Sequence, residues 1–289
     1  MVANNGVPAA AAGRISLDAG MTVNRMGFGA MRLTGPGIWG EPSDPEECRR
    51  VLRRALELGI DFIDTADSYG PEVSERLIAE TLHPYPAGLV IGTKGGQLRP
   101  GPGQWVPDGR PKHLRMALEG SLRRLRVDQI DLYQLHRPDP RVPYEESLGV
   151  LVEAKREGKI RAIGVSNVNR EELQTAVGMT TIASVQNRYN MTDRDSDDVL
   201  QRCVELAIVF IPWAPIKFDE AGSNSVRRVA AERGITTRQL ALAWIFARSP
   251  QTLPIPGTAS VAHLEENVAA AAVHLTPDEV RQLGAPSHR

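Results

Sequence analysis

The sequence of 289 residues predicts an α/β fold, a (β/α)8 TIM barrel preceded by an N-terminal β-hairpin. Short apolar stretches of strand length alternate with amphipathic stretches of helix length, and this alternation occurs eight times. Eight such units close a barrel, and barrels of roughly 250 residues commonly form one domain. No linker or low-complexity segment interrupts the pattern. We therefore expect residues 1–13, rich in Ala, Asn and Gly, to be a flexible tail and residues 14–289 to be a single domain.

The elements follow in order along the chain. The hairpin is expected at 15–17 and 22–26, around the turn Asp18-Ala19-Gly20. The first barrel strand, 27–31, has little side-chain bulk, which allows another group to approach its backbone closely. Further strands are expected at 61–66, 89–94, 129–136, 160–165, 184–186, 208–213 and 252–256. Helices are expected at 45–58, 74–82, 111–125, 144–157, 170–177, 197–207, 225–233, 237–248 and 261–271.

Two further expectations concern individual segments. The insert at 95–108, which contains Trp105, is the longest stretch without periodicity and is a candidate substrate loop. In the helix at 74–82, Glu75 and Glu80 are expected to face solvent.

The composition excludes several classes of function. The net charge is −1, which argues against a nucleic-acid or membrane surface. The two cysteines form no CxxC motif, so neither a disulfide framework nor a zinc site is indicated. No apolar run reaches membrane-spanning length, and the N-terminus lacks the basic start of a signal peptide. These features predict a cytoplasmic protein, a monomer or a weak homo-oligomer, that acts on a small molecule.

Polar residues end three consecutive strands of the predicted barrel. Asp64, Lys94 and His136 end the second, third and fourth strands, and Tyr69 lies on the loop after the second. Strand ends of this kind converge on one face of a barrel. A phenol is a poor acid at neutral pH until a cation stabilises its anion, and Lys94, oriented by Asp64, would supply that cation. His136 would orient the oxygen that receives the proton. The other interpretation is a salt bridge at the rim with an unrelated histidine.

Six segments of the chain resemble the aldo-keto reductase family. They are residues 59–69, 91–94, 131–136, 164–167, 186–189 and 254–267. The resemblance runs from about Met26 to Leu283, and its family is a (β/α)8 barrel that reduces aldehydes and ketones with a nicotinamide cofactor, without metal. It implies that Asp64, Tyr69, Lys94 and His136 are a catalytic tetrad, with Tyr69 as the proton donor.

The same resemblance implies positions for the cofactor. It places Ser166, Asn167 and Gln186 at the nicotinamide carboxamide and Trp213 against the nicotinamide ring. Ala30 and Met31 would also touch the cofactor. Gly257 and Thr258 would hold the adenosine-side phosphate near a helix start, and Glu266 and Asn267 would contact adenine. Many members have a lysine where Gly257 stands and an arginine where His263 stands. NADPH is expected because the family commonly uses it, and NADH is possible. His263 and Lys217 are the candidate contacts of the 2′-phosphate of NADPH. The other interpretation of Lys217 is a solvated loop lysine.

The loop at 27–40 and the segment 255–264 resemble the bacterial pyridoxal-reductase branch of the family. Met31 and Trp39 would put a soft side chain and a flat ring near the nicotinamide, and Trp105 would close over the other side. This predicts an aromatic-aldehyde substrate, with pyridoxal one candidate. The alternative interpretation is that these residues only pack the loop. Since His136 is usual in general carbonyl reducers, a broad ketone or xenobiotic reductase is a second hypothesis.

Two other classes of function agree less well with the sequence. A cofactor-binding regulatory or sensor barrel is disfavoured because all four tetrad positions are filled. A phosphate-handling lyase or isomerase is suggested by Gly257 and Thr258 alone and has no account of Tyr69 with Lys94.

Overall fold

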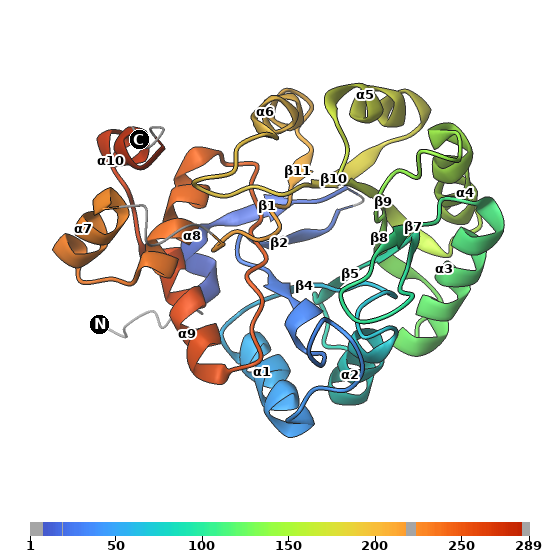
Figure 1. Cartoon of the computed structure of the whole chain (residues 1–289), viewed down its shortest axis with the longest axis horizontal. Coiled ribbons are helices and arrows are strands. Elements are labelled where there is room, and N and C mark those ends of the chain that lie inside the picture. Colours follow the sequence, from blue (N-terminus) through green and yellow to red (C-terminus); the bar gives the residue numbers. More distant parts are fainter. Residues whose placement is uncertain (1–7, 19, 218–223, 285–289) are drawn as a thin grey trace.

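The computed structural model describes residues 8–18, 20–217 and 224–284. A seven-stranded parallel sheet forms its centre, in the order β11-β10-β9-β8-β5-β4-β3. Its strands are β3 (Phe28–Gly29), β4 (Phe62–Asp64), β5 (Val90–Gly95), β8 (Ile130–Leu135), β9 (Ile160–Ser166), β10 (Ile182–Gln186) and β11 (Val209–Phe210). Figure 1 shows this sheet curling through the middle of the molecule with helices around it. The predicted alternation of strand and helix is confirmed.

The helices lie around the sheet, most of them on its outer face (Figure 1). They are α1 (Pro45–Glu57), α2 (Val73–Leu82), α3 (Pro111–Leu125), α4 (Tyr144–Arg156), α5 (Arg170–Met179), α6 (Asp197–Glu205), α7 (Asn224–Arg233), α8 (Thr237–Arg248), α9 (Val261–Ala269) and α10 (Pro277–Gly284). Short 3-10 turns η2 (Ala30–Arg32) and η3 (Ala270–Ala272) follow β3 and α9. Several helix starts are capped as the sequence suggests: Asp44 accepts from the Glu47 amide ahead of Pro45, and α5 and α8 begin with capping boxes. None of the helices in the described ranges is long and apolar enough to cross a bilayer.

The expected last strand, 252–256, is an extended segment that closes the barrel without being a regular strand. On one side the Leu253 amide donates to the Phe210 carbonyl at 2.9 Å. On the other side the carbonyls of Pro254 and Pro256 accept from Gly27 and Gly29 of the first-strand region at 3.0 and 3.4 Å. Proline has no N–H, so Pro254 and Pro256 cannot donate hydrogen bonds to the first-strand region, and only their carbonyls take part in the pairing. The segment therefore lies where the last strand was predicted, but it does not form the hydrogen bonds of a regular strand.

The hairpin β1 (Arg14–Ser16) and β2 (Thr22–Asn24) closes one end of the barrel, as expected; Ala19 of its turn lies outside the described residues. Its apolar side chains join a cluster with inward-facing residues of the barrel strands, among them Phe62, Val90 and Leu132. A larger cluster lies between the sheet and the helices. The polar strand ends are thus left at the opposite, open end of the barrel.

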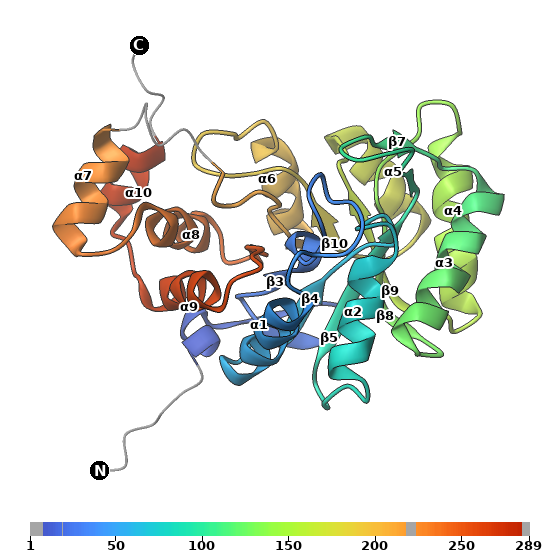
Figure 2. The ribbon, with the colours of Figure 1, turned by 60° about the horizontal axis from the view of Figure 1, so that its bottom comes forward.

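Three local expectations differ from the structure. Within the expected tail, Pro8–Ala12 forms the 3-10 helix η1, and Ala9 is fully buried with its amide on the Leu58 carbonyl; residues 1–7 lie outside the described residues. Glu75 is fully buried rather than solvent-facing, because α2 turns it toward β5, where it accepts from Thr93 Oγ1 at 2.5 Å. The insert forms a ribbon of β6 (Gln97–Leu98) and β7 (Val106–Pro107), which Figure 2 shows on the upper side of the sheet.

Candidate active site

The structure brings three of the four predicted tetrad residues, Asp64, Lys94 and Tyr69, into direct contact. Lys94 Nζ lies 2.7 Å from Asp64 Oδ2 and 3.3 Å from the Tyr69 hydroxyl. It also donates to the Thr65 carbonyl at 2.8 Å. Lys94 is fully buried and Asp64 is 2% exposed, so the ion pair is shielded from solvent. A buried cation that touches both a carboxylate and a phenol is suited to stabilise a phenolate.

Asp64 is held in place by two amides as well as by the lysine. Its Oδ1 accepts from Gln186 Nε2 at 2.8 Å and from Gln134 Nε2 at 3.2 Å. Gln186 was expected at the nicotinamide carboxamide, but here its donor is committed to Asp64. Gln134 was not singled out from the sequence, although the period-two alternation that puts Leu132 inside the barrel puts Gln134 there as well. The carboxylate therefore has all of its partners from strands and is rigidly placed.

Burial sets the protonation states of the contacting pair. Burial raises the pKa of Tyr69 above its ordinary value, and the charge of Lys94 offsets only part of that shift. For Lys94 burial acts against the charge, but Asp64 and Tyr69 outweigh it, and the pKa of Lys94 is raised. The expected acidification of Tyr69 by Lys94 is present as a contribution and is smaller than the effect of burial. Both groups hold their protons at neutral pH, as a proton donor must.

His136 faces Tyr69 across the mouth of the site. Their ring centroids are 5.9 Å apart, edge to face, and His136 Nδ1 lies 3.3 Å from the Ser68 hydroxyl. Burial, followed by the charges of Lys94, Arg137 and Arg99, lowers the pKa of His136 well below its ordinary value. The imidazole is thus neutral, and its second nitrogen remains available to a ligand.

The residues expected at the nicotinamide form one hydrogen-bonded group beside His136. Ser166 Oγ donates to the Gln186 carbonyl at 2.7 Å, and Asn167 Nδ2 donates to the His136 carbonyl at 3.0 Å. Trp213 Nε1 donates to Asn167 Oδ1 at 3.1 Å, which fixes the half-buried indole next to the strand ends. Asn167 has a φ of 57°, a left-handed conformation that asparagine tolerates better than most residues. These hydrogen bonds hold Ser166, Asn167 and Trp213 together as one group.

The segment expected to hold a phosphate lies against the first strand. A Cβ on Gly257 would stand 2.5 Å from the Gly29 carbonyl oxygen, so the two backbones approach as only glycine allows. Arg32, which was not among the predicted site residues, has its Cγ 3.6 Å from that Cβ position. Thr258 Oγ1 accepts from the Ser260 amide, and the Val261 amide at the start of α9 is already taken by Glu47 at 3.0 Å.

The remaining cofactor candidates lie on and near α9. Glu266 stands 4.0 Å from Arg238, and Asn267 is 2% exposed with its Oδ1 buried and unpartnered among the described residues. Buried amide oxygens in proteins normally accept a hydrogen bond, so the Asn267 Oδ1 atom could accept one from a bound ligand. His263 and Lys217 are both exposed, and the structure brings neither of them to a described anionic partner.

Two tryptophans expected at the substrate lie near Tyr69. The Trp105 ring is 6.3 Å from the rings of both Tyr69 and His136. Trp39 forms a parallel bridge with Gly70, the residue after Tyr69. Met31 is half-buried in η2 behind the fully buried Ala30. The rings of Trp105 and His136 thus contact Tyr69 on the open side of the barrel.

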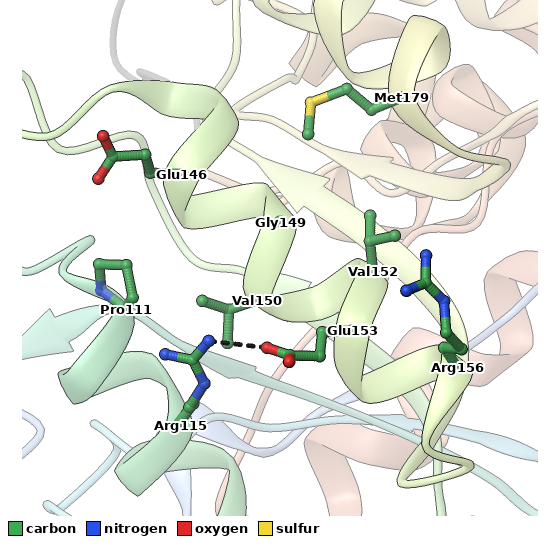
Figure 3. Close-up of a pocket in the computed structure, with 9 residues that line it drawn as sticks. All are labelled: Pro111, Arg115, Glu146, Gly149, Val150, Val152, Glu153, Arg156 and Met179. Carbon is green, nitrogen blue, oxygen red and sulfur yellow. Dashed lines mark hydrogen bonds and ion pairs between the residues drawn. The ribbon is translucent and has the colours of Figure 1, made fainter.

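Two hollows border the described part of the chain. The larger, of about 490 Å³, is a groove between α3, α4 and the end of α5, bordered by the Arg115–Glu153 ion pair and Met179 (Figure 3). It gathers no group from the tetrad. The other, of about 420 Å³, borders the loop after β4, where Asp67 Oδ1 is buried without a described partner.

Comparison with known proteins agrees with this geometry. The model of the "Aldo/keto reductase family" matches residues 25–285. An uncharacterized oxidoreductase of Schizosaccharomyces pombe is 47% identical over 97% of this chain and 92% of its own length. Pyridoxine 4-dehydrogenase of Escherichia coli is 40% identical over 91% of this chain and 94% of its own length.

A solved structure supports the fold independently. The aldo-keto reductase of Klebsiella pneumoniae in complex with NADPH superposes with a TM-score of 0.79 at 26% identity, over 95% of this chain and 96% of the other. The predicted barrel class is therefore confirmed. The chain is a member of the aldo/keto reductase family and an NAD(P)H-dependent oxidoreductase.

Proposed function

We propose that the protein, with residues 14–289 as one catalytic domain, uses NADPH to reduce aldehydes, that Tyr69 donates the proton, and that flat aromatic aldehydes such as pyridoxal are its substrates. The observation that carries the proposal is Lys94 Nζ between Asp64 Oδ2 and the Tyr69 hydroxyl, at 2.7 and 3.3 Å. A bound nicotinamide would supply the hydride at this site.

Tyr69 gives up its proton as negative charge develops on the carbonyl oxygen. Lys94 then faces a phenolate at contact distance, and the Lys94–Asp64 pair changes from a shielded ion pair into a stabiliser of the new anion. Neutral His136 orients the carbonyl oxygen through a hydrogen bond from its free nitrogen. The rings of Trp105 and His136 meet that of Tyr69 edge to face on the side from which a carbonyl group would approach.

The cofactor proposal rests on three features of the chain. The close approach of Gly29 and Gly257 fixes the position of the segment proposed to bind a phosphate, and Arg32 Cγ lies 3.6 Å from where a Cβ on Gly257 would stand. The Asn267 oxygen lies buried without a donor, as an adenine contact would require. Trp213, fixed by Asn167, offers a ring face to the nicotinamide. NADPH is preferred over NADH in this proposal because a relative of known structure was solved with NADPH.

The test of the proton donor is Tyr69→Phe. Turnover should fall by roughly 10²–10⁴-fold while NADPH affinity stays nearly unchanged. A variant that turns over at the wild-type rate would remove Tyr69 from the mechanism. It would also favour the sensor hypothesis if the wild type itself turned over slowly in a single-turnover experiment with a reactive aldehyde.

The tests of cofactor and substrate are comparative. His263→Ala and Lys217→Ala should each weaken NADPH more than NADH if these residues contact the 2′-phosphate. For the substrate, kcat/KM is compared for pyridoxal, a nitrobenzaldehyde and an aliphatic aldehyde of similar size. Equal reduction of all three would contradict the aromatic-aldehyde proposal and favour a broad carbonyl reductase.

A further inference from the structure

Arg99 is a buried cation without a carboxylate. It is 8% exposed, and among the described residues it forms no ion pair. Its guanidinium donates instead to four backbone carbonyls: Nε to Gln104 at 2.8 Å, Nη1 to Ile38 at 2.8 Å and to Ser68 at 2.9 Å, and Nη2 to Gly37 at 2.9 Å. Buried guanidinium groups are usually paired with acids. This one joins three loops: the first-strand loop, the loop that carries Tyr69, and the insert.

The first of these loops depends on such support. Gly37 and Ile38 have φ angles of 70° and 57°, and the left-handed region is unfavourable for a β-branched residue such as isoleucine. Both carbonyls of this turn accept from Arg99. The turn leads directly into Trp39, which bridges to Gly70. Arg99 therefore stabilises the conformation that places Trp39 beside the reactive tyrosine.

The guanidinium plane also contacts both candidate substrate tryptophans. Arg99 Cζ lies 3.6 Å from the centroid of the Trp105 ring and 5.7 Å from that of Trp39. Trp105 in turn meets Tyr69 and His136 edge to face at 6.3 Å. One side chain thus sets the position of both indoles relative to the phenol and the imidazole.

We infer that Arg99 is a specificity-determining positioning residue, which holds Trp105 and Trp39 as the two aromatic contacts of a planar substrate above Tyr69. The inference rests on the proposed function. A lysine cannot take over this role, because its ammonium has neither the planar face that stacks on Trp105 nor the fork that reaches three loops.

The experiment compares Arg99→Met and Arg99→Lys with the wild type. KM and kcat are measured for nitrobenzaldehyde and for an aliphatic aldehyde of similar size, and the affinity for NADPH is measured separately. One aromatic contact contributes about 2- to 12-fold in binding. We expect both variants to raise KM for nitrobenzaldehyde by about tenfold, with kcat within about threefold, unchanged NADPH affinity, and little change for the aliphatic aldehyde. Arg110→Met is the matched control, because Arg110 follows the same insert but is exposed and paired with Asp108.

A triple variant shows whether Arg99 acts through the two tryptophans. Arg99→Met combined with Trp39→Ala and Trp105→Ala should have the KM of the Trp39→Ala/Trp105→Ala double variant, within about twofold. The inference is overturned if Arg99→Lys behaves as the wild type, or if Arg99→Met loses kcat equally on both aldehydes together with thermal stability. If the wild type prefers aromatic to aliphatic aldehydes and Arg99→Met keeps the same preference, this inference fails while the proposed function stands. A Tyr69→Phe variant at full rate defeats the proposed function instead.

Discussion

Lys94→Met separates the chemical role of Lys94 from its structural role. The substitution removes the ammonium that lies 2.7 Å from Asp64 Oδ2 and 3.3 Å from the Tyr69 hydroxyl. Methionine has a similar length and flexibility, so it fills the same buried channel without a cavity. What is lost is one partner of a fully buried ion pair.

The magnitude follows from what Asp64 retains. Breaking a buried pair by removing one partner typically costs about 3–5 kcal/mol. Asp64 keeps the amides of Gln186 and Gln134 on its Oδ1, so the loss of stability should lie near the lower end. Turnover should fall by roughly 10²–10⁴-fold, because the phenolate of Tyr69 loses its cation.

The assays are thermal unfolding and NADPH-dependent turnover, applied to Lys94→Met and to Asp64→Asn/Lys94→Met. The double variant removes both charges, so it should recover most of the lost stability and none of the activity. Lys155→Met is the control, since its pair with Asp18 is about 30% exposed on each side and should contribute no more than about 1 kcal/mol. The reasoning is refuted if Lys94→Met retains more than a third of the wild-type turnover, or if the double variant recovers activity.

Three further predictions follow from buried groups and close contacts. Glu75→Gln should lower the free energy of unfolding by about 3 kcal/mol in thermal or chemical unfolding, because Glu75 is fully buried and paired with Arg124. The control Glu80→Gln, on the exposed side of α2, should change it by less than about 0.5 kcal/mol. Equal effects of the two substitutions would contradict the buried placement of Glu75. Burial and then Glu75 raise the pKa of Asp67 to about 8. The folded protein then keeps a proton that the unfolded chain releases near pH 4, so stability should fall between about pH 4 and pH 8. Asp67→Asn should reduce this dependence of stability on pH. The prediction is contradicted if the thermal midpoints at pH 5 and pH 8 differ by as much in Asp67→Asn as in the wild type. Gly257→Ala should lower both the stability and the NADPH affinity, because the new methyl group would meet the Gly29 carbonyl oxygen at 2.5 Å. The control is Gly149→Ala in α4, where no atom lies within 4 Å of the added Cβ. This substitution should leave both properties intact or raise the stability by up to about 1 kcal/mol.

The sequence by itself determined the barrel and which polar side chains end its strands at one face. Strand and helix periodicities differ, so eight alternations were countable, and the carboxyl ends of parallel strands must share one face. Asp64, Lys94 and His136 could be assigned to one mouth for that reason. The alternation also held the signal for Gln134, two residues before His136, which is found only when inward-facing positions are followed through the polar end of the strand.

Only the tertiary structure decided which partner each polar group meets. Gln134 of β8 and Gln186 of β10 both donate to Asp64 at the end of β4, because the barrel brings these three strands together around one carboxylate, an arrangement that no local pattern encodes. Glu75 is buried because the packing of α2 against β5 and α3 turns one helix position inward. The segment at 252–256 closes the barrel through proline carbonyls, since its neighbours on both sides come from distant parts of the chain. Arg99 stood in a loop without periodicity, and its role arises from carbonyls of residues 37, 38, 68 and 104, which only the folded chain brings around one guanidinium.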